Sequence, residues 1–256
     1  NLIEAQFEHV FINKQQVIRL FKLIAQSKDI DGIAPQTLRL LRHTRRGLLG
    51  ELQDYQGCRE EFIAILNHPS GTQKALALMH RYGILASYFP QWRYIEGQMQ
   101  FDMHNAYTVD EHSFKTLQFI DSFKHSKDKT SLAYSVYRSV KDELALKLAA
   151  LLHHLSGKQA IDKNMLSAMQ AKEIADLHLL KNSTNKRIQW LITNQDLLIS
   201  AIQTMNINEP EEIKRLAQVI NSQKKFRIKS IPFTIGIIKS VIIKSGTWLS
   251  AICKPT

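Results

Sequence analysis

The sequence contains few of the residues that interrupt secondary structure or cross-link a chain. Its 256 residues include only 10 Gly, 6 Pro and 2 Cys. Because glycine and proline are the strongest turn formers, their scarcity predicts long elements. The two cysteines, Cys58 and Cys253, are too few for a disulfide framework and too far apart for a zinc ribbon. This cysteine usage favours a reducing, cytoplasmic location.

The sequence also lacks an apolar run long enough to cross a membrane. Its longest such run, residues 231–243, contains Lys239 and is shorter than the ~20 residues that a membrane-spanning helix needs. We therefore interpret it as a buried helix and expect no membrane association. No signal-peptide pattern opens the sequence, and Asn1 is not an initiator methionine. We expect the chain to be a portion of a longer protein.

Acidic residues are under-represented relative to basic ones. The chain has 34 Lys and Arg against 23 Asp and Glu, which gives a net charge of +11. A basic surface attracts the phosphate backbone of nucleic acids. Here the basic residues are spread over several segments, including 39–46, 124–129 and 224–229, without the interleaved aromatics or glycine loops of a nucleic-acid site. We interpret them as solvated helix faces and expect no nucleic-acid partner.

The apolar residues, in contrast, are plentiful and recur at helical spacing. Hydrophobic residues make up 44% of the chain, and Val17, Leu20, Phe21 and Ile24 show the stripe of an amphipathic helix. Alternating strand patterns are scarce, so we predict an all-α protein. The predicted helices cover residues 13–26, 35–49, 58–67, 72–89, 108–123, 144–154, 165–180, 184–202 and 209–223, and a last one ends near 245, with a turn at 68–71 and a structured connection over 90–106.

One helix start carries a distinct signature. Thr108 and Glu111 have the spacing of a capping box, in which each side chain binds the other residue's backbone N–H. Thr108 is therefore the predicted N-cap, and this places His112 near the first turn.

A histidine pair follows an apolar helix in "LALKLAALLHHLSGK" (144–158). Taken alone, His153 is more typical of a core histidine with satisfied hydrogen bonds than of a ligand. Generic motifs give no alternative, because the sequence contains no Gly-rich phosphate loop, no H-E-x-x-H and no G-x-S-x-G.

Longer segments carry a more specific signal. The segments "LRHTRRGL" (41–48), "MHRYGILASYFPQW" (79–92) and "GQMQFDMHNAYTVDEH" (97–112) resemble the bifunctional protein-PII uridylyltransferase/uridylyl-removing enzymes of nitrogen regulation. The resemblance implies two domains. Residues 1–96 would be the helical region that follows a nucleotidyltransferase core, and residues 97–256 an HD-domain-like helical bundle. The nucleotidyltransferase motif and the glutamine-binding ACT repeats of that family have no counterpart in this sequence.

The same resemblance implies a metal site in the HD-like bundle. In that family a divalent ion, Mg²⁺ or Mn²⁺, activates water to remove the uridylyl group. His112 and His153 match two of the family's ligands. The pattern otherwise departs from the family's: His154 stands in place of aspartate, Lys163 and Gln195 in place of histidines, and Gly236 in place of the last aspartate, while Asp162 is retained. A protonated lysine cannot bind a metal, glycine has no ligand atom in its side chain, and glutamine offers only a weak neutral oxygen.

These substitutions remove most of the ligands that the resemblance implies for the metal site. We expect the hydrolytic site to be lost, with no catalytic residue and no bound cofactor, and with His112 and His153 in one site and Lys163 at its rim. The remaining role would be structural or regulatory, with the PII signal protein and flanking nucleotidyltransferase and ACT domains as the implied partners. The alternative is a uridylyl-removing phosphodiesterase that uses His112, His153 and His154 as a reduced ligand set. The sequence leaves open whether the chain is an enzyme.

Overall fold

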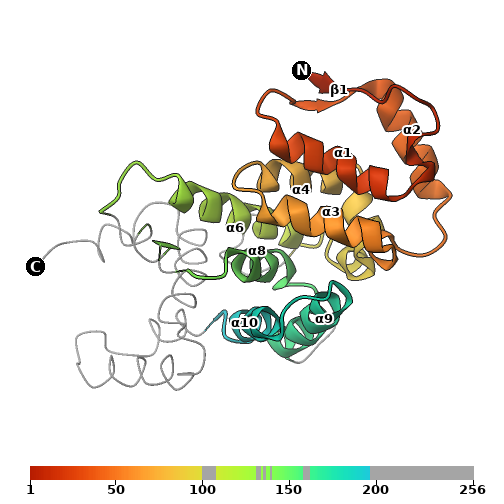
Figure 1. Cartoon of the computed structure of the whole chain (residues 1–256). Coiled ribbons are helices and arrows are strands. Elements are labelled where there is room, and N and C mark those ends of the chain that lie inside the picture. The colour runs from red at the N-terminus through yellow and green to blue at the C-terminus, as the bar shows by residue number, and fades with distance from the viewer. Residues whose placement is uncertain (100–107, 131–133, 135–136, 139, 158–161, 197–256) are drawn as a thin grey trace, which may run out of the picture. The chain divides into compact units, whose positions relative to one another are not determined.

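The computed structural model describes residues 1–99, 108–130, 134, 137, 138, 140–157 and 162–196 (Figure 1). The helices predicted over 209–223 and up to 245, together with Gly236, lie outside these residues. The chain divides into two compact units, Asn1–Glu96 and Gly97–Thr256. The prediction of an all-α fold is confirmed.

The first unit is built from short helices and one small pair of strands. The strands β1 and β2 pair in parallel, with Leu2 opposite Gly32 and Ile3 opposite Ile33. In chain order the elements are β1 (Leu2–Ile3), η1 (Val10–Ile12), α1 (Gln15–Gln26), β2 (Gly32–Ile33), α2 (Pro35–Arg46), η2 (Leu52–Asp54), α3 (Gln56–Asn67), α4 (Thr72–Arg81), α5 (Ile84–Tyr88) and η3 (Pro90–Tyr94).

The core of this unit forms where α1 packs against α3 and α4 (Figure 1). The predicted stripe of α1 is buried, and Phe21 and Ile24 have no exposed surface. On α3, the Phe62 ring stacks on Tyr88 at a centroid distance of 4.4 Å and meets Phe89 edge-on at 5.3 Å. Such aromatic pairs stabilise a core beyond their buried area.

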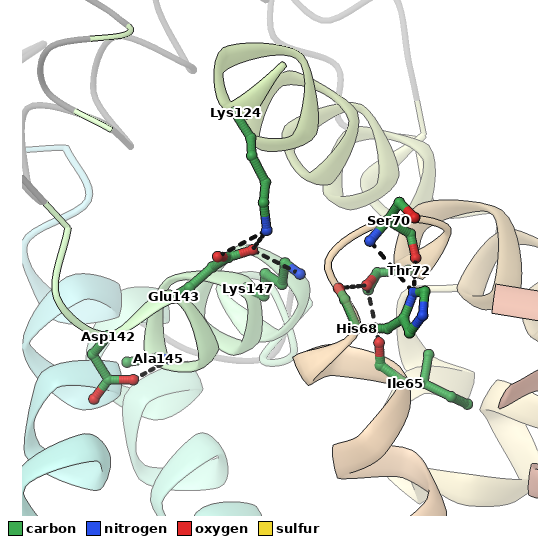
Figure 2. Close-up of polar contacts among 9 residues, drawn as sticks. All are labelled: Ile65, His68, Ser70, Thr72, Lys124, Asp142, Glu143, Ala145 and Lys147. Carbon is green, nitrogen blue, oxygen red and sulfur yellow. Dashed lines mark hydrogen bonds and ion pairs between the residues drawn. The ribbon is translucent and has the colours of Figure 1, made fainter. Parts of the chain in front are cut away.

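The predicted turn at 68–71 separates α3 from α4. The Thr72 hydroxyl donates to the Ile65 carbonyl over 2.9 Å, and His68 Nδ1 contacts the Ser70 carbonyl (Figure 2). Gly71 has a φ of +81°, a left-handed conformation that glycine adopts without steric cost. The side chains that flank the turn thus bind the backbone groups left over at the helix ends.

A second break was not predicted. The single helix expected over 72–89 is divided, because α4 ends at Arg81 and Gly83 has a φ of +70°. Over this break lies Arg45, whose Nη1 donates to the Tyr82 carbonyl at 3.3 Å. A Cβ on Gly83 would lie 1.7 Å from that nitrogen. The motifs 41–48 and 79–92, which are distant in sequence, therefore meet here.

The second unit contains α6 (Val109–Lys124), α8 (Glu143–Leu152), α9 (Lys163–Leu177) and α10 (Asn182–Thr193). Helices α6 and α8 are antiparallel: Lys124 at the end of α6 lies 2.9 Å from Glu143 at the start of α8, whereas His112 near the start of α6 meets His153 just after α8. The 12 residue steps from His112 to Lys124 and the 10 from Glu143 to His153 correspond to about 18 and 15 Å along the two helices. Helix α10 packs against α8 and α9.

The end of the α6–α8 pair that lies away from the histidines holds a cluster of charges, of which Lys147 is buried and Glu143 and Lys124 are partly buried. Lys147 is 2.9 Å from the Glu143 carboxylate, which also accepts hydrogen bonds from Lys124 at 2.9 and 3.1 Å (Figure 2). Burial alone would raise the pKa of Glu143, but the hydrogen bonds from both lysines lower it below its ordinary value. This cluster fixes the register of α6 against α8, and hence the position of the histidines at the other end.

No helix within the described residues combines the length and the apolar character that a membrane span requires.

Candidate functional site

His112 is positioned by the capping box predicted from the sequence. Thr108 is the N-cap of α6, and its backbone N–H donates to Glu111 at 3.4 Å. The buried carboxylate of Asp110 accepts a hydrogen bond from the backbone N–H of Gly97 at 3.1 Å, which ties the incoming chain to the helix. His112 follows in the first turns and is 8% exposed. The predicted N-cap and the location of His112 are confirmed.

His153 lies directly after the last residue of α8 and is 1% exposed. Its Nδ1 is 2.8 Å from the carbonyl oxygen of Ala150. A carbonyl can only accept, so Nδ1 carries the proton and the lone pair of the neutral ring is on Nε2. This arrangement, with one ring nitrogen bound to the backbone, is typical of histidines whose other nitrogen acts as a ligand.

His154 completes a group of three imidazoles. The ring centroids are 4.0 Å apart for His153 and His154, and 5.3 Å apart for each of these with His112. One nitrogen of each ring lies within 4.8 Å of the others. The expected proximity of His112 and His153 is therefore confirmed, although their sequence positions lie on different helices.

The geometry of this group fits a small metal ion only after a local adjustment. Tetrahedral zinc with Zn–N bonds of 2.0–2.1 Å places its nitrogen ligands about 3.3 Å apart. The three nitrogens, separated by up to 4.8 Å, would have to close by side-chain rotation. Among the described residues, no aspartate, glutamate or cysteine joins them. The donor set is therefore three neutral nitrogens, which suits zinc better than Mg²⁺ or Mn²⁺.

Asp162, the retained acidic residue, caps a helix in this structure. It is the N-cap of α9, its Oδ1 accepts from the Met165 N–H at 2.9 Å, and its side chain is exposed. Lys163 is the first residue of α9 and is also exposed. The carboxylate at 162 is thus used by the backbone of α9.

Gln195 is buried beside His153, at 2% exposure. Its Nε2 donates to the His153 carbonyl at 3.3 Å and contacts Asn164 Oδ1. Asn164 in turn donates through Nδ2 to the Asp196 carboxylate at 2.7 Å. Because a carboxylate only accepts, it orients the amide of Asn164, which then orients that of Gln195. The amide at 195 therefore holds the end of α8 to α9.

Sequence reasoning did not identify Asn164 and Asp196 as part of this surrounding network. Neither belongs to a motif, and both are joined to the site only by folding, across the packed helices α9 and α10. Gly236, the remaining position predicted for the site, lies outside the described residues.

Fold and site together define the class: an all-α protein in which two antiparallel helices bring three histidines into contact. The comparisons with known proteins then show which proteins the chain is similar to. Residues 1–88 match the family described as the third domain of uridylyltransferase GlnD. The chain is 39% identical over 231 residues to the bifunctional uridylyltransferase/uridylyl-removing enzyme of Pseudoalteromonas translucida, 35% over 229 residues to that of Photobacterium profundum and 33% over 231 residues to that of Vibrio atlanticus.

These matches cover 88–89% of this chain, and they confirm the resemblance to the bifunctional uridylyltransferase/uridylyl-removing enzymes. The chain is related to a part of these enzymes, since it spans 26% of the length of the relatives it matches.

Proposed function

We propose that this chain is a counterpart of the central helical region and the HD domain of a uridylyltransferase/uridylyl-removing enzyme, in which the phosphodiesterase site no longer hydrolyses. Residues 1–96 would follow the nucleotidyltransferase core, and residues 97–256 would be the HD-like domain. In a protein with flanking domains, its role is structural or regulatory: it holds the transferase and sensory portions together or docks the PII signal protein, in the cytoplasm.

The proposal is supported by the contacts that the polar side chains at the predicted ligand positions make. A hydrolytic HD site needs carboxylates, which neutralise the charge of the ion and retain Mg²⁺ or Mn²⁺. Here Asp162 caps α9, and position 154 presents an imidazole. At position 195, where the family has a histidine, an amide donates to the His153 carbonyl. Asp162 and Gln195 thus each have a structural role that does not require a metal.

A second candidate function rests on the three imidazoles. Their mutual proximity and the tautomer of His153 support a zinc site with three protein nitrogens and an open position, the ligand number of several catalytic zinc centres. Zinc held there would lower the pKa of a bound water and supply hydroxide for removal of a uridylyl group. In this alternative His112, His153 and His154 would hold the ion.

Metal content separates the two functions. After dialysis, we expect the purified chain to retain less than about 0.1 equivalent of Mn²⁺ or Mg²⁺, because loss of an outer-shell partner alone costs roughly 10–100-fold in metal affinity and direct ligands matter more. Elemental analysis measures this directly. The alternative function would be established instead if the purified chain retained one equivalent of zinc and removed uridylyl groups, and if His153→Ala lost the zinc.

A further inference from the structure

Helix α2 carries a row of arginines on its solvent-facing side. Arg39, Arg42 and Arg46 are all exposed, whereas the buried residues of the helix are Thr37 and Leu41. With 100° between successive residues, the three arginines fall within about 60° of one another on the side opposite Thr37. They extend over about 10 Å along the axis. We refer to Arg39, Arg42 and Arg46 as the arginine row.

The row has no ion-pair partner in the described part of the chain. None of its three arginines takes part in an ion pair there, and α2 itself contains no acidic residue. Arg45, on the flank of the helix, is engaged with the Tyr82 carbonyl instead. The row is thus a concentrated positive surface in a chain whose net charge is +11.

The stability of the helix does not account for the row. Like charges three or four residues apart repel each other and destabilise a helix. The helix dipole favours a cation only in the last turn, which explains Arg46 but not Arg39 or Arg42. A helix selected for stability alone would place glutamates among these arginines. The row therefore points to a partner with negative charge.

An exposed apolar side chain just after the row indicates what kind of partner fits. Leu49, three residues after Arg46, is 88% exposed. Apolar groups next to arginines are typical of protein interfaces, whereas a phosphate backbone offers them nothing to cover.

We propose that the arginine row, with Leu49 at its end, is a docking surface for an acidic protein segment that carries apolar residues among its carboxylates. A partner helix with acidic residues at positions i, i+3 and i+7 matches the spacing of the row. Arginine presents a planar fork of donors that binds carboxylates in a bidentate manner, so each position of the row has a defined partner group.

The test measures binding of two fluorescent probes to the full chain by anisotropy at physiological salt. One probe is a 20-residue helical peptide with glutamates at that spacing and leucines beside them; the other is a single-stranded RNA of 20 nucleotides. The variant Arg39→Gln/Arg42→Gln/Arg46→Gln should weaken peptide binding by about tenfold or more, since arginines are frequent energetic centres of interfaces. Leu49→Ser should weaken peptide binding, but not RNA binding, by about threefold.

The control removes the same charge elsewhere. Lys127, Lys129 and Lys186 are exposed and lie in the second unit, and their joint replacement by glutamine should change peptide affinity by less than about threefold. Thermal melts of all variants check folding. The proposal would be overturned by an equal loss of peptide affinity in the two triple variants, or by absence of peptide binding. It would also be overturned if the chain bound the RNA more tightly than the peptide and Leu49→Ser left the RNA affinity unchanged.

Discussion

Replacement of Glu143 by glutamine is expected to lower the free energy of unfolding by about 3 kcal/mol, because it removes the charge of the carboxylate that binds the buried Lys147 ammonium. The Lys147 side chain is only 2% exposed and lies 2.9 Å from the Glu143 carboxylate. That carboxylate also accepts from Lys124 and so joins α6 to α8 (Figure 2). Urea denaturation followed by circular dichroism measures the change.

A pair of the same i,i+4 spacing provides the control. Lys172 and Asp176 on α9 are 2.6 Å apart, and each side chain is 53% exposed. Lys172→Gln should therefore change stability by less than about 1 kcal/mol. Adding Lys147→Met to Glu143→Gln removes the buried ammonium that has lost this partner, and it should recover part of the loss. A Glu143→Gln protein as stable as the parent would show that the cluster does not hold the two helices together.

The effect of Glu143 should depend on pH in a defined direction. Its folded-state pKa is lowered, so the stability that it provides is present above its unfolded pKa and is lost as the pH falls through the folded value. The difference between the parent and Glu143→Gln should thus shrink below about pH 4. Burial raises the pKa of the neighbouring Asp121, which acts in the opposite direction, but Asp121 is present in both proteins.

Replacement of Gly71 by alanine should destabilise the first unit by about 3 kcal/mol. The left-handed conformation costs about 1–2 kcal/mol for a residue with a Cβ, and overpacking against a rigid neighbour costs a further 1–3 kcal/mol. The neighbour is backbone: a Cβ at Gly71 would lie 2.2 Å from the Ala25 carbonyl oxygen of α1. Chemical denaturation of the full chain gives the value.

Gly50 separates the two contributions within the same unit. Its φ of +83° is similar, but a Cβ there meets only the carboxylate end of Asp54, at 3.1 Å. Gly50→Ala should therefore show the conformational cost alone, about 1–2 kcal/mol. If both variants lost equal stability, the close approach of α1 to the turn at 68–71 would carry no energetic weight.

The helical elements were predictable because their signals are local. The apolar stripe of α1, Pro35 at the start of α2 and the capping box at Thr108 each act within one or two turns of chain. The break at Gly83 was missed because apolar residues continue at helical spacing on both sides of it. Its cause is partly tertiary, since Arg45 lies over the glycine and binds the Tyr82 carbonyl.

The candidate site was predictable in part. Proximity of His112 and His153 followed from the family resemblance, whereas composition and spacing would have left His153 as an ordinary core histidine. The role of Asp162 as a helix cap, and the orientation of Gln195 by Asn164 and Asp196, depend on packing of α9 and α10. Such contacts between distant segments leave no periodic trace in the sequence.

We propose that hydrolysis has been lost from a site whose histidines are still assembled. Release of UMP from uridylylated PII, measured with the full chain in excess Mn²⁺, tests it most directly. The account predicts a rate no higher than that without protein, and the same rate for His153→Ala. UMP release that depends on Mn²⁺ and disappears in His153→Ala would contradict this proposal. The three histidines would then suffice for a hydrolysis that is proposed to require carboxylates.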